Sequence, residues 1–223
     1  MAQPVHMGRA HRTVYGCGRR GAGTGVRGVM MARMDTRSLV GGVLLAAGGG
    51  TRFADPGHKL RAELNGRALF QWSIDALIGA GLPSLAVVTG AVDLSDLIPA
   101  GVDRLANPAW REGQATSLAV AVRWATAHHL SALLVGLGDQ PRITSSAWRT
   151  VAATDRTPVT IATYAGRRGH PVRLAREIWD RLPVTGDRGA GELIAGSPEL
   201  VTEVACEGDA SDIDTVEDLT RWR

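Results

Sequence analysis

The sequence contains a single lysine, Lys59, which lies shortly after a glycine-rich turn that follows an apolar run. All other basic side chains counted with it are arginines, so the retained lysine indicates a need for a compact charge on a flexible stem. The glycines at 48–50 let a ligand approach the backbone N–H groups closely, and Arg52 adds a second cation. Together these residues predict a phosphate-binding site. The simpler alternative is a tight strand-to-helix turn with solvated cations.

Two familiar phosphate-binding patterns do not fit this turn. The P-loop pattern requires serine or threonine after its lysine, whereas Leu60 follows Lys59. The dinucleotide-binding pattern Gly-x-Gly-x-x-Gly can begin at Gly48, but its third glycine position is Phe53. The stretch at 45–52, Leu-Ala-Ala-Gly-Gly-Gly-Thr-Arg, instead resembles the signature of nucleotidyltransferases, which transfer a nucleoside monophosphate from an NTP.

Two aspartates are candidate ligands for a magnesium ion that bridges phosphates. Asp139 follows an apolar run and lies between Gly138 and Pro141, and carboxylate oxygens are suitable ligands for Mg²⁺. Asp214, near the C-terminus, is expected to reach the same site. Asp139 could instead cap a helix or form a turn. Asp214 could simply begin a helix whose acidic residues interact favourably with the helix dipole.

From residue 39 onward, short apolar runs alternate with helical patterns. The patterns predict strands at 40–46, 85–89, 104–107, 132–137, 159–164 and 200–205, a hairpin at 166–169, and helices at 69–78, 117–127, 145–153, 175–182, 189–196 and 216–221. This alternation predicts an α/β fold, with a doubly wound and mostly parallel sheet. Ligands bind beyond the carboxyl ends of the strands in such sheets, and both the glycine turn and Asp139 fall at strand ends.

The charge is distributed unevenly along the chain. The formal net charge is +3, but residues 1–39 hold seven arginines and one aspartate, a segment charge of +6 that leaves −3 for the rest. A mildly acidic body argues against a nucleic-acid-binding face. Because residues 1–38 are rich in glycine and lack apolar periodicity, they are expected to be a disordered basic extension or to reflect a mis-assigned start. The domain itself is then expected to cover 39–223.

Other features point to an ordinary cytoplasmic protein. No apolar run approaches the roughly 20 residues that a membrane helix requires. The pair Arg19-Arg20 is not followed by the apolar stretch of an export signal. Cys17 and Cys206 provide neither a disulfide framework nor a metal cluster. We therefore expect no membrane partner.

Six short motifs occur in one order from about Leu39 to the end of the chain. They are the glycine turn with Lys59, then 107–118, 138–141, 169–172, 186–190 and 212–219. Each is weak alone, but together they resemble the molybdenum-cofactor nucleotidyltransferases, in particular the MocA-like cytidylyltransferase branch of the MobA-like NTP transferase family. This resemblance implies a Rossmann-like fold of the nucleotide-diphospho-sugar transferase type.

The resemblance also implies a reaction. An enzyme of this branch uses Mg²⁺ and transfers CMP from CTP to the terminal phosphate of the molybdenum-pterin cofactor, releasing pyrophosphate. A recipient molybdoenzyme is then an expected partner. Ala47 stands where guanylyl enzymes tend to carry glycine, which favours CTP. A phosphate monoester is largely ionised near neutral pH, so its attack requires no general base.

Site roles follow from the resemblance. The predicted nucleotide contacts are Leu45, Ala46, Ala47, Gly48, Gly49, Gly50, Arg52, Lys59, Asn107 and Ser117. Lys59, Arg52 and Asp139 are the predicted catalytic residues, and Asp139 and Asp214 the predicted metal ligands. The residues expected to face the acceptor are Gly169, His170, Pro171 and Asp187. Two alternatives stay open: a related NTP transferase that uses GTP or another phosphorylated acceptor, and a non-catalytic carrier of the molybdenum cofactor.

Overall fold

The computed structural model describes residues 39–51, 53 and 57–221, and all of them belong to one compact unit. The predicted basic extension at 1–38 lies outside the described residues. No helix within these ranges is long and apolar enough to cross a membrane.

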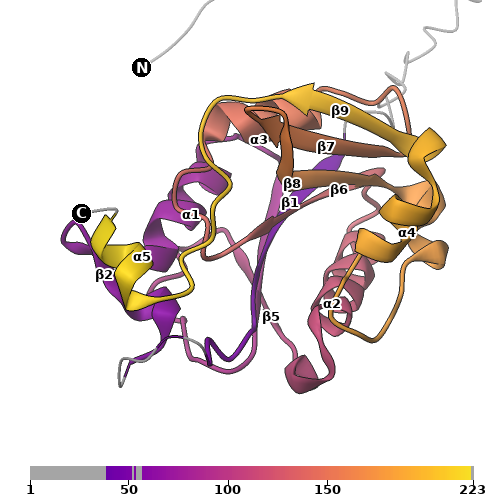
Figure 1. Cartoon of the computed structure of the whole chain (residues 1–223). Coiled ribbons are helices and arrows are strands. Elements are labelled where there is room, and N and C mark those ends of the chain that lie inside the picture. The colour runs from indigo at the N-terminus through magenta and orange to yellow at the C-terminus, as the bar shows by residue number, and fades with distance from the viewer. Residues whose placement is uncertain (1–38, 52, 54–56, 222–223) are drawn as a thin grey trace, which may run out of the picture. The chain divides into compact units, whose positions relative to one another are not determined.

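A seven-stranded sheet forms the centre of the domain, with the strand order β5-β4-β1-β6-β8-β7-β9 (Figure 1). Its strands are β1 (Val40–Ala46), β4 (Ser84–Thr89), β5 (Asp103–Ala106), β6 (Ala132–Leu137), β7 (Val159–Tyr164), β8 (Arg167–Ala175) and β9 (Val201–Ala205). The pairs β5–β4, β4–β1, β1–β6 and β7–β9 are parallel, whereas β8 runs antiparallel to both β6 and β7. The predicted α/β fold with a mostly parallel sheet is therefore confirmed.

Helices cover both faces of this sheet. The α-helices are α1 (Leu69–Ile78), α2 (Gln114–Ala127), α3 (Ser145–Ala152), α4 (Gly191–Gly196) and α5 (Val216–Arg221). Short 3-10 helices are η2 (Lys59–Arg61), η3 (Trp110–Glu112), η4 (Arg176–Arg181) and η5 (Pro198–Leu200), and β2 (Glu63–Leu64) pairs with β3 (Arg67–Ala68). One apolar cluster packs α1 and α3 against the sheet, and a second packs α2 and η4 against the sheet.

Strand β1 shows why the sheet is covered on both sides. Its seven residues are all buried. Leu44 belongs to the cluster under α1 and α3, while Val43 and Leu45 belong to the cluster under α2. Successive side chains of a strand point to opposite faces, so an uninterrupted apolar run is the pattern of a strand buried on both faces.

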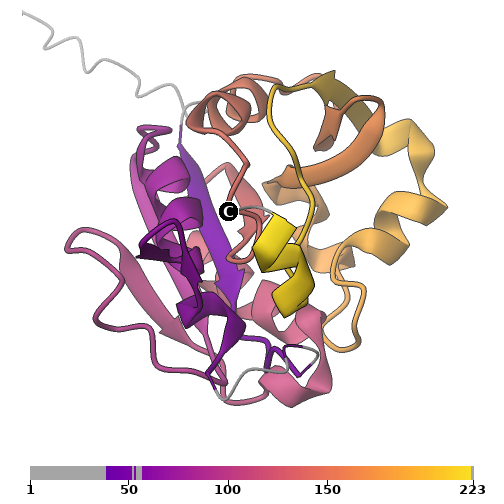
Figure 2. The same cartoon turned by 60° about the vertical axis from the view of Figure 1, so that its left-hand side comes forward.

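The C-terminal segment returns from β9 towards the beginning of the domain and ends in α5, drawn in yellow in Figures 1 and 2. The Ile213 N–H donates to the Asp139 carbonyl at 3.1 Å. Ile213 and Leu219 are buried in a cluster with Phe53, Leu64 and other apolar side chains. This packing carries residue 214 to the end of β6.

Strand β8 is the main departure from the predicted elements, since the sequence predicted only a hairpin turn there. The chain from Arg167 contains glycine and proline, which ordinarily weaken a strand assignment. In the β7–β8 register, Ile161 pairs with Val172 and Ala162 with Gly169, so two β8 residues are left over at this irregularity. The proline falls in this gap, where its missing N–H does not interrupt the ladder.

Two helix predictions also need correction. The helix expected at 175–182 is the 3-10 helix Arg176–Arg181. The helix expected at 117–127 begins at Gln114, with Gly113 as its N-cap at a φ of 105°. Thr116 and Ser117 therefore lie in the first turn of this helix. The Thr116 hydroxyl donates to the Gly113 carbonyl at 2.8 Å.

Candidate active site

The glycine turn after β1 is held between two walls. On one side, a Cβ added to Gly49 would lie 3.0 Å from the Trp110 ring. On the other side, Gly50 has a φ of 60°, and a Cβ there would lie 3.3 Å from both His58 and Lys59. A side chain at either glycine would have to displace its neighbours, so the turn exposes bare backbone to the adjoining cavity.

His58 ties this turn to η2. Its Nε2–H donates to the Gly48 carbonyl at 2.8 Å, and its Nδ1 accepts a hydrogen bond from the Leu60 N–H at 3.3 Å. Both bonds together require the neutral imidazole. Burial lowers the pKa of His58 and so favours this form. The imidazole therefore fixes the distance between the glycine turn and Lys59.

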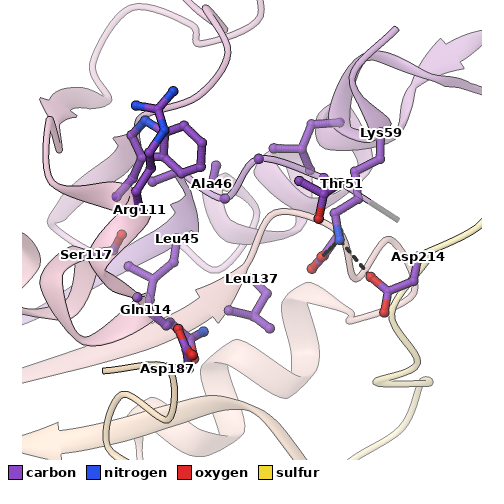
Figure 3. Close-up of a pocket in the computed structure, with 18 residues that line it drawn as sticks. Leu45, Ala46, Thr51, Lys59, Arg111, Gln114, Ser117, Leu137, Asp187 and Asp214 are labelled. Carbon is purple, nitrogen blue, oxygen red and sulfur yellow. Dashed lines mark hydrogen bonds and ion pairs between the residues drawn. The ribbon is translucent and has the colours of Figure 1, made fainter. Parts of the chain in front are cut away.

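Lys59 pairs with both predicted metal ligands (Figure 3). Its Nζ donates to Asp139 Oδ2 at 2.5 Å and to Asp214 Oδ1 at 2.9 Å. These side chains are only 13%, 16% and 23% exposed, in the order lysine, Asp139, Asp214. Burial opposes the charged ammonium, but the two carboxylates outweigh it and raise the pKa of Lys59. The two carboxylates therefore converge on one point, where a cation is held.

The same carboxylates fit a divalent cation. Asp139 Oδ1 is buried and accepts no hydrogen bond from the described residues, and an unsatisfied carboxylate oxygen is costly unless a ligand completes it. Nearby, Gln140 Nε2 donates to Asp212 Oδ1 at 2.7 Å, and burial together with the charge of Asp139 raises the pKa of Asp212. Within the described residues no three histidine, cysteine or acidic side chains form a metal cluster. Asp139 and Asp214 would thus hold the ion, with phosphate oxygens and water completing its shell.

A cavity of about 430 Å³ opens between these groups and the start of α2 (Figure 3). The predicted residues that line it are Leu45, Ala46, Ala47, Gly48, Gly49, Gly50, Lys59, Ser117, Asp139, Asp187 and Asp214. Arg52 lies outside the described residues. The volume falls in the range of small-molecule sites. Segments far apart in the sequence are thereby brought to one place at the carboxyl ends of β1 and β6.

Asn107 lies behind the cavity wall and does not line it. It is 2% exposed, and its Nδ2 donates to the hydroxyls of Thr116 and Ser117, both at 2.9 Å. Its Oδ1 accepts from the Ala109 N–H at 3.1 Å. The predicted direct contact with a nucleotide is therefore corrected: Asn107 orients the first turn of α2, and Ser117 is the residue that reaches the cavity.

The four residues expected at the acceptor are separated. Asp187 lines the main cavity, whereas His170 lines a second cavity of about 200 Å³. Burial lowers the pKa of His170 to about 4, so its imidazole is neutral near pH 7. Gly169 and Pro171 line neither cavity. A Cβ on Gly169 would lie 2.5 Å from Ala210 Cβ, which assigns this glycine to close packing against the C-terminal segment.

Several further residues of the main cavity were not among the predicted contacts, and Trp110, Arg111 and Gln114 are three of them. Trp110 packs on the glycine turn, and the guanidinium of Arg111 lies 4.3 Å from the centre of its ring. Gln114, the first residue of α2, lines both cavities. The sequence offered one signal, an aromatic and an arginine beside a glycine between a strand and a helix. That signal does not say which way the side chains face.

Known proteins resemble this chain in sequence and in fold. The family model for the MobA-like NTP transferase domain matches residues 42–203. No relative among the curated proteins matches the sequence. The crystal structure of Rv0371c from Mycobacterium tuberculosis is 26% identical, with a TM-score of 0.69, and the match covers 83% of this chain and 97% of that one.

Two further structures are informative. A complex of Rv0371c with manganese is 25% identical, with a TM-score of 0.68, and the match covers 82% of this chain and 97% of that one. A nucleotidyl transferase from Methanothermobacter thermautotroptrophicus is 22% identical in sequence, with a TM-score of 0.72. The match covers 82% of this chain and 95% of that one, and it shows a shared fold. The fold is thus that of the nucleotidyltransferases.

Proposed function

Because the chain belongs to the family of the MobA-like NTP transferase domain, we propose that it transfers CMP from CTP to the terminal phosphate of the molybdenum-pterin cofactor. Membership of an NTP transferase family supports nucleotidyl transfer. One observation carries the proposal: a bare glycine turn, the ammonium of Lys59 and the carboxylates of Asp139 and Asp214 surround a single cavity. This combination suits a triphosphate bound with a divalent cation.

The reaction rests on positioning and neutralisation of charge. The backbone N–H groups at 48–50 and the cations of Lys59 and Arg52 bind the triphosphate. Asp139 and Asp214 would hold Mg²⁺, which would supply positive charge beside the phosphates. An acceptor phosphate oxygen then bonds to the α-phosphorus while the bond from that phosphorus to the bridging oxygen breaks, releasing pyrophosphate. The attacking monoester is largely ionised near neutral pH, so these residues need not remove a proton.

Ala47 supports the choice of cytosine. It lines the cavity, and its carbonyl accepts the Ala91 N–H at 3.0 Å. A Cβ on Gly90 would lie 2.9 Å from the Ala47 Cβ, so this methyl group is fixed by close packing. The preference for cytosine rests on the resemblance, because guanylyl enzymes tend to carry glycine where Ala47 stands. Ser117 supplies a hydroxyl on the same wall.

The carrier alternative fits the site less well. A protein that only delivers finished cofactor does not need a lysine paired with two carboxylates beside a bare glycine turn. Bringing these charges together costs desolvation, and a triphosphate site gives that arrangement a function. A recipient molybdoenzyme remains a proposed partner of the transferase.

The test is pyrophosphate release by the purified protein with Mg²⁺, molybdenum-loaded molybdopterin and either CTP or GTP. We expect release with CTP, and Asp139→Asn should abolish it. Asp180→Asn, which changes an exposed aspartate in η4 outside both cavities, is the matched control. Preference for GTP would overturn the base assignment, and binding of nucleotide without release would overturn the acceptor.

A further inference from the structure

The two cavities meet at a single pair of side chains. Leu45 and Gln114 line both the main cavity and the second cavity. Leu45 offers no side-chain hydrogen bond, and its carbonyl already accepts the Gly138 N–H at 3.0 Å. Gln114 is half-buried, and its side-chain amide makes no hydrogen bond with any residue that the structure describes. The junction therefore carries one unused donor and acceptor group.

The position of Gln114 is fixed by a backbone crossing. The Ala115 N–H donates to the Gly186 carbonyl at 2.9 Å, and the Gly186 N–H donates to the Glu112 carbonyl at 3.1 Å. A Cβ on Gly113 would lie 2.4 Å from the backbone of Gly186, so the two segments touch without room for a side chain. Gln114 thus projects from a rigid point towards the cavities (Figure 3).

The second cavity differs in character from the first. Most of its wall is apolar, with Leu118, Val135, Val172, Leu174 and Ile194 among its lining residues. Its polar side chains besides Gln114 are His170 and Arg188. A ligand that fits here packs its body mainly against apolar side chains, and its polar groups can meet His170 and Arg188. Any phosphate on that ligand has to approach the main cavity past Gln114.

We infer that Gln114 binds the phosphate of the acceptor at this junction, while the body of the acceptor lies in the second cavity. The inference rests on the proposed function. A CMP group that passes from a nucleotide in the main cavity to an acceptor in the second cavity must do so where the two cavities meet. The amide of Gln114 can donate two hydrogen bonds to phosphate oxygens there.

An uncharged donor suits the junction because a carboxylate is close by. A Cβ on Gly113 would lie 2.7 Å from Asp187 Oδ1, so Asp187 lies next to the start of α2. A second carboxylate at position 114 would repel an anionic acceptor, whereas the amide holds the phosphate through its N–H groups.

The test measures binding of inorganic phosphate, the group shared by all phosphorylated acceptors. The protein is first saturated with α,β-methylene-CTP and Mg²⁺, so that nucleotide phosphates fill the main cavity. Equilibrium dialysis with radiolabelled phosphate then compares wild type with Gln114→Leu, Gln114→Glu and the control Arg123→Gln, an exposed position on the same helix. Calorimetric titration with α,β-methylene-CTP measures the nucleotide affinity of each variant.

We expect Gln114→Leu to weaken phosphate binding about tenfold or more, as loss of a hydrogen bond to a charged group does. Gln114→Glu should weaken it further, and Gln114→Leu should change phosphate affinity more than it changes nucleotide affinity. Arg123→Gln should match wild type. Equal phosphate affinity in wild type and both Gln114 variants, or no phosphate binding at all, would overturn the inference. If phosphate binding depends on Gln114 but molybdopterin yields no pyrophosphate, the proposed acceptor fails and the role of Gln114 stands.

Discussion

Replacing Lys59 with alanine is expected to strengthen the binding of a divalent cation to the nucleotide-free protein. The Lys59 ammonium lies 2.5 Å from Asp139 Oδ2 and 2.9 Å from Asp214 Oδ1. It therefore occupies the point on which both proposed metal ligands converge. A metal ion has to displace this ammonium before it can bind both carboxylates, and in Lys59→Ala that competitor is gone.

The size of the effect follows from the charges involved. Two unit charges about 4 Å apart interact by about 4 kcal/mol at an effective dielectric constant of about 20. The three side chains are 13–23% exposed, so solvent screening reduces this value. Displacement also releases the ammonium to water, which offsets part of the cost. A net gain of about 1.5–3 kcal/mol is left, which corresponds to about tenfold to hundredfold tighter binding.

The assay is titration of Mn²⁺ followed by electron paramagnetic resonance of the free ion, without nucleotide. The control is Arg61→Ala, in the same 3-10 helix, whose exposed guanidinium pairs with Asp96 instead of the site. Nucleotide affinity should change in the opposite direction, because Lys59→Ala removes a cation from the triphosphate. If Mn²⁺ binds Lys59→Ala no more tightly than wild type, the ammonium does not compete with the metal ion.

Three more outcomes are expected. Gly49→Ala should weaken nucleotide binding about tenfold, because its methyl group would lie 3.0 Å from the Trp110 ring, and Trp110→Ala in the same chain should restore part of the loss in a calorimetric titration. The pKa of His170 is lowered from 6.5 to about 4. Between pH 4 and pH 6.5 the folded protein therefore binds fewer protons than the unfolded chain. The contribution of His170 to the free energy of unfolding is complete above pH 6.5 and is lost as the pH falls towards 4, by up to about 3 kcal/mol. Melting temperatures from pH 7 to pH 4 should accordingly fall less in His170→Gln, and parallel curves would contradict this assignment. Removal of residues 1–33, which the sequence places before the domain, should leave the melting temperature and pyrophosphate release unchanged, and a clear loss of either would refute that boundary.

Strong local patterns predicted the strands that hold the site. β1, β6 and β7 begin and end at the predicted residues, because continuous apolar runs between turn residues have few alternatives to a buried strand. β8 was not predicted as a strand because its glycine, proline and arginines oppose that assignment locally. It forms because β6 and β7 provide ladder partners on both sides, which is a tertiary effect.

Residue types and their order carried the prediction of a phosphate and metal site. It rested on the lone lysine after a glycine turn and on an aspartate at a strand end, since few side chains can neutralise a triphosphate, and it stays a prediction. The sequence could not show that Lys59 pairs with both aspartates, because its partners lie 80 and 155 residues away. It also placed Asn107 among the nucleotide contacts, although burial makes this residue a support for α2.

The sequence by itself determined the alternation of strands and helices, the glycine turn and the charged groups available for phosphate chemistry. Only the tertiary structure decided which of these groups share a cavity. Gln114 lies where the two cavities meet because the backbone of Gly186 packs against Glu112 and Gly113, the residues before Gln114. Such a contact depends on how distant segments fit together in space, and a local sequence pattern carries no record of it.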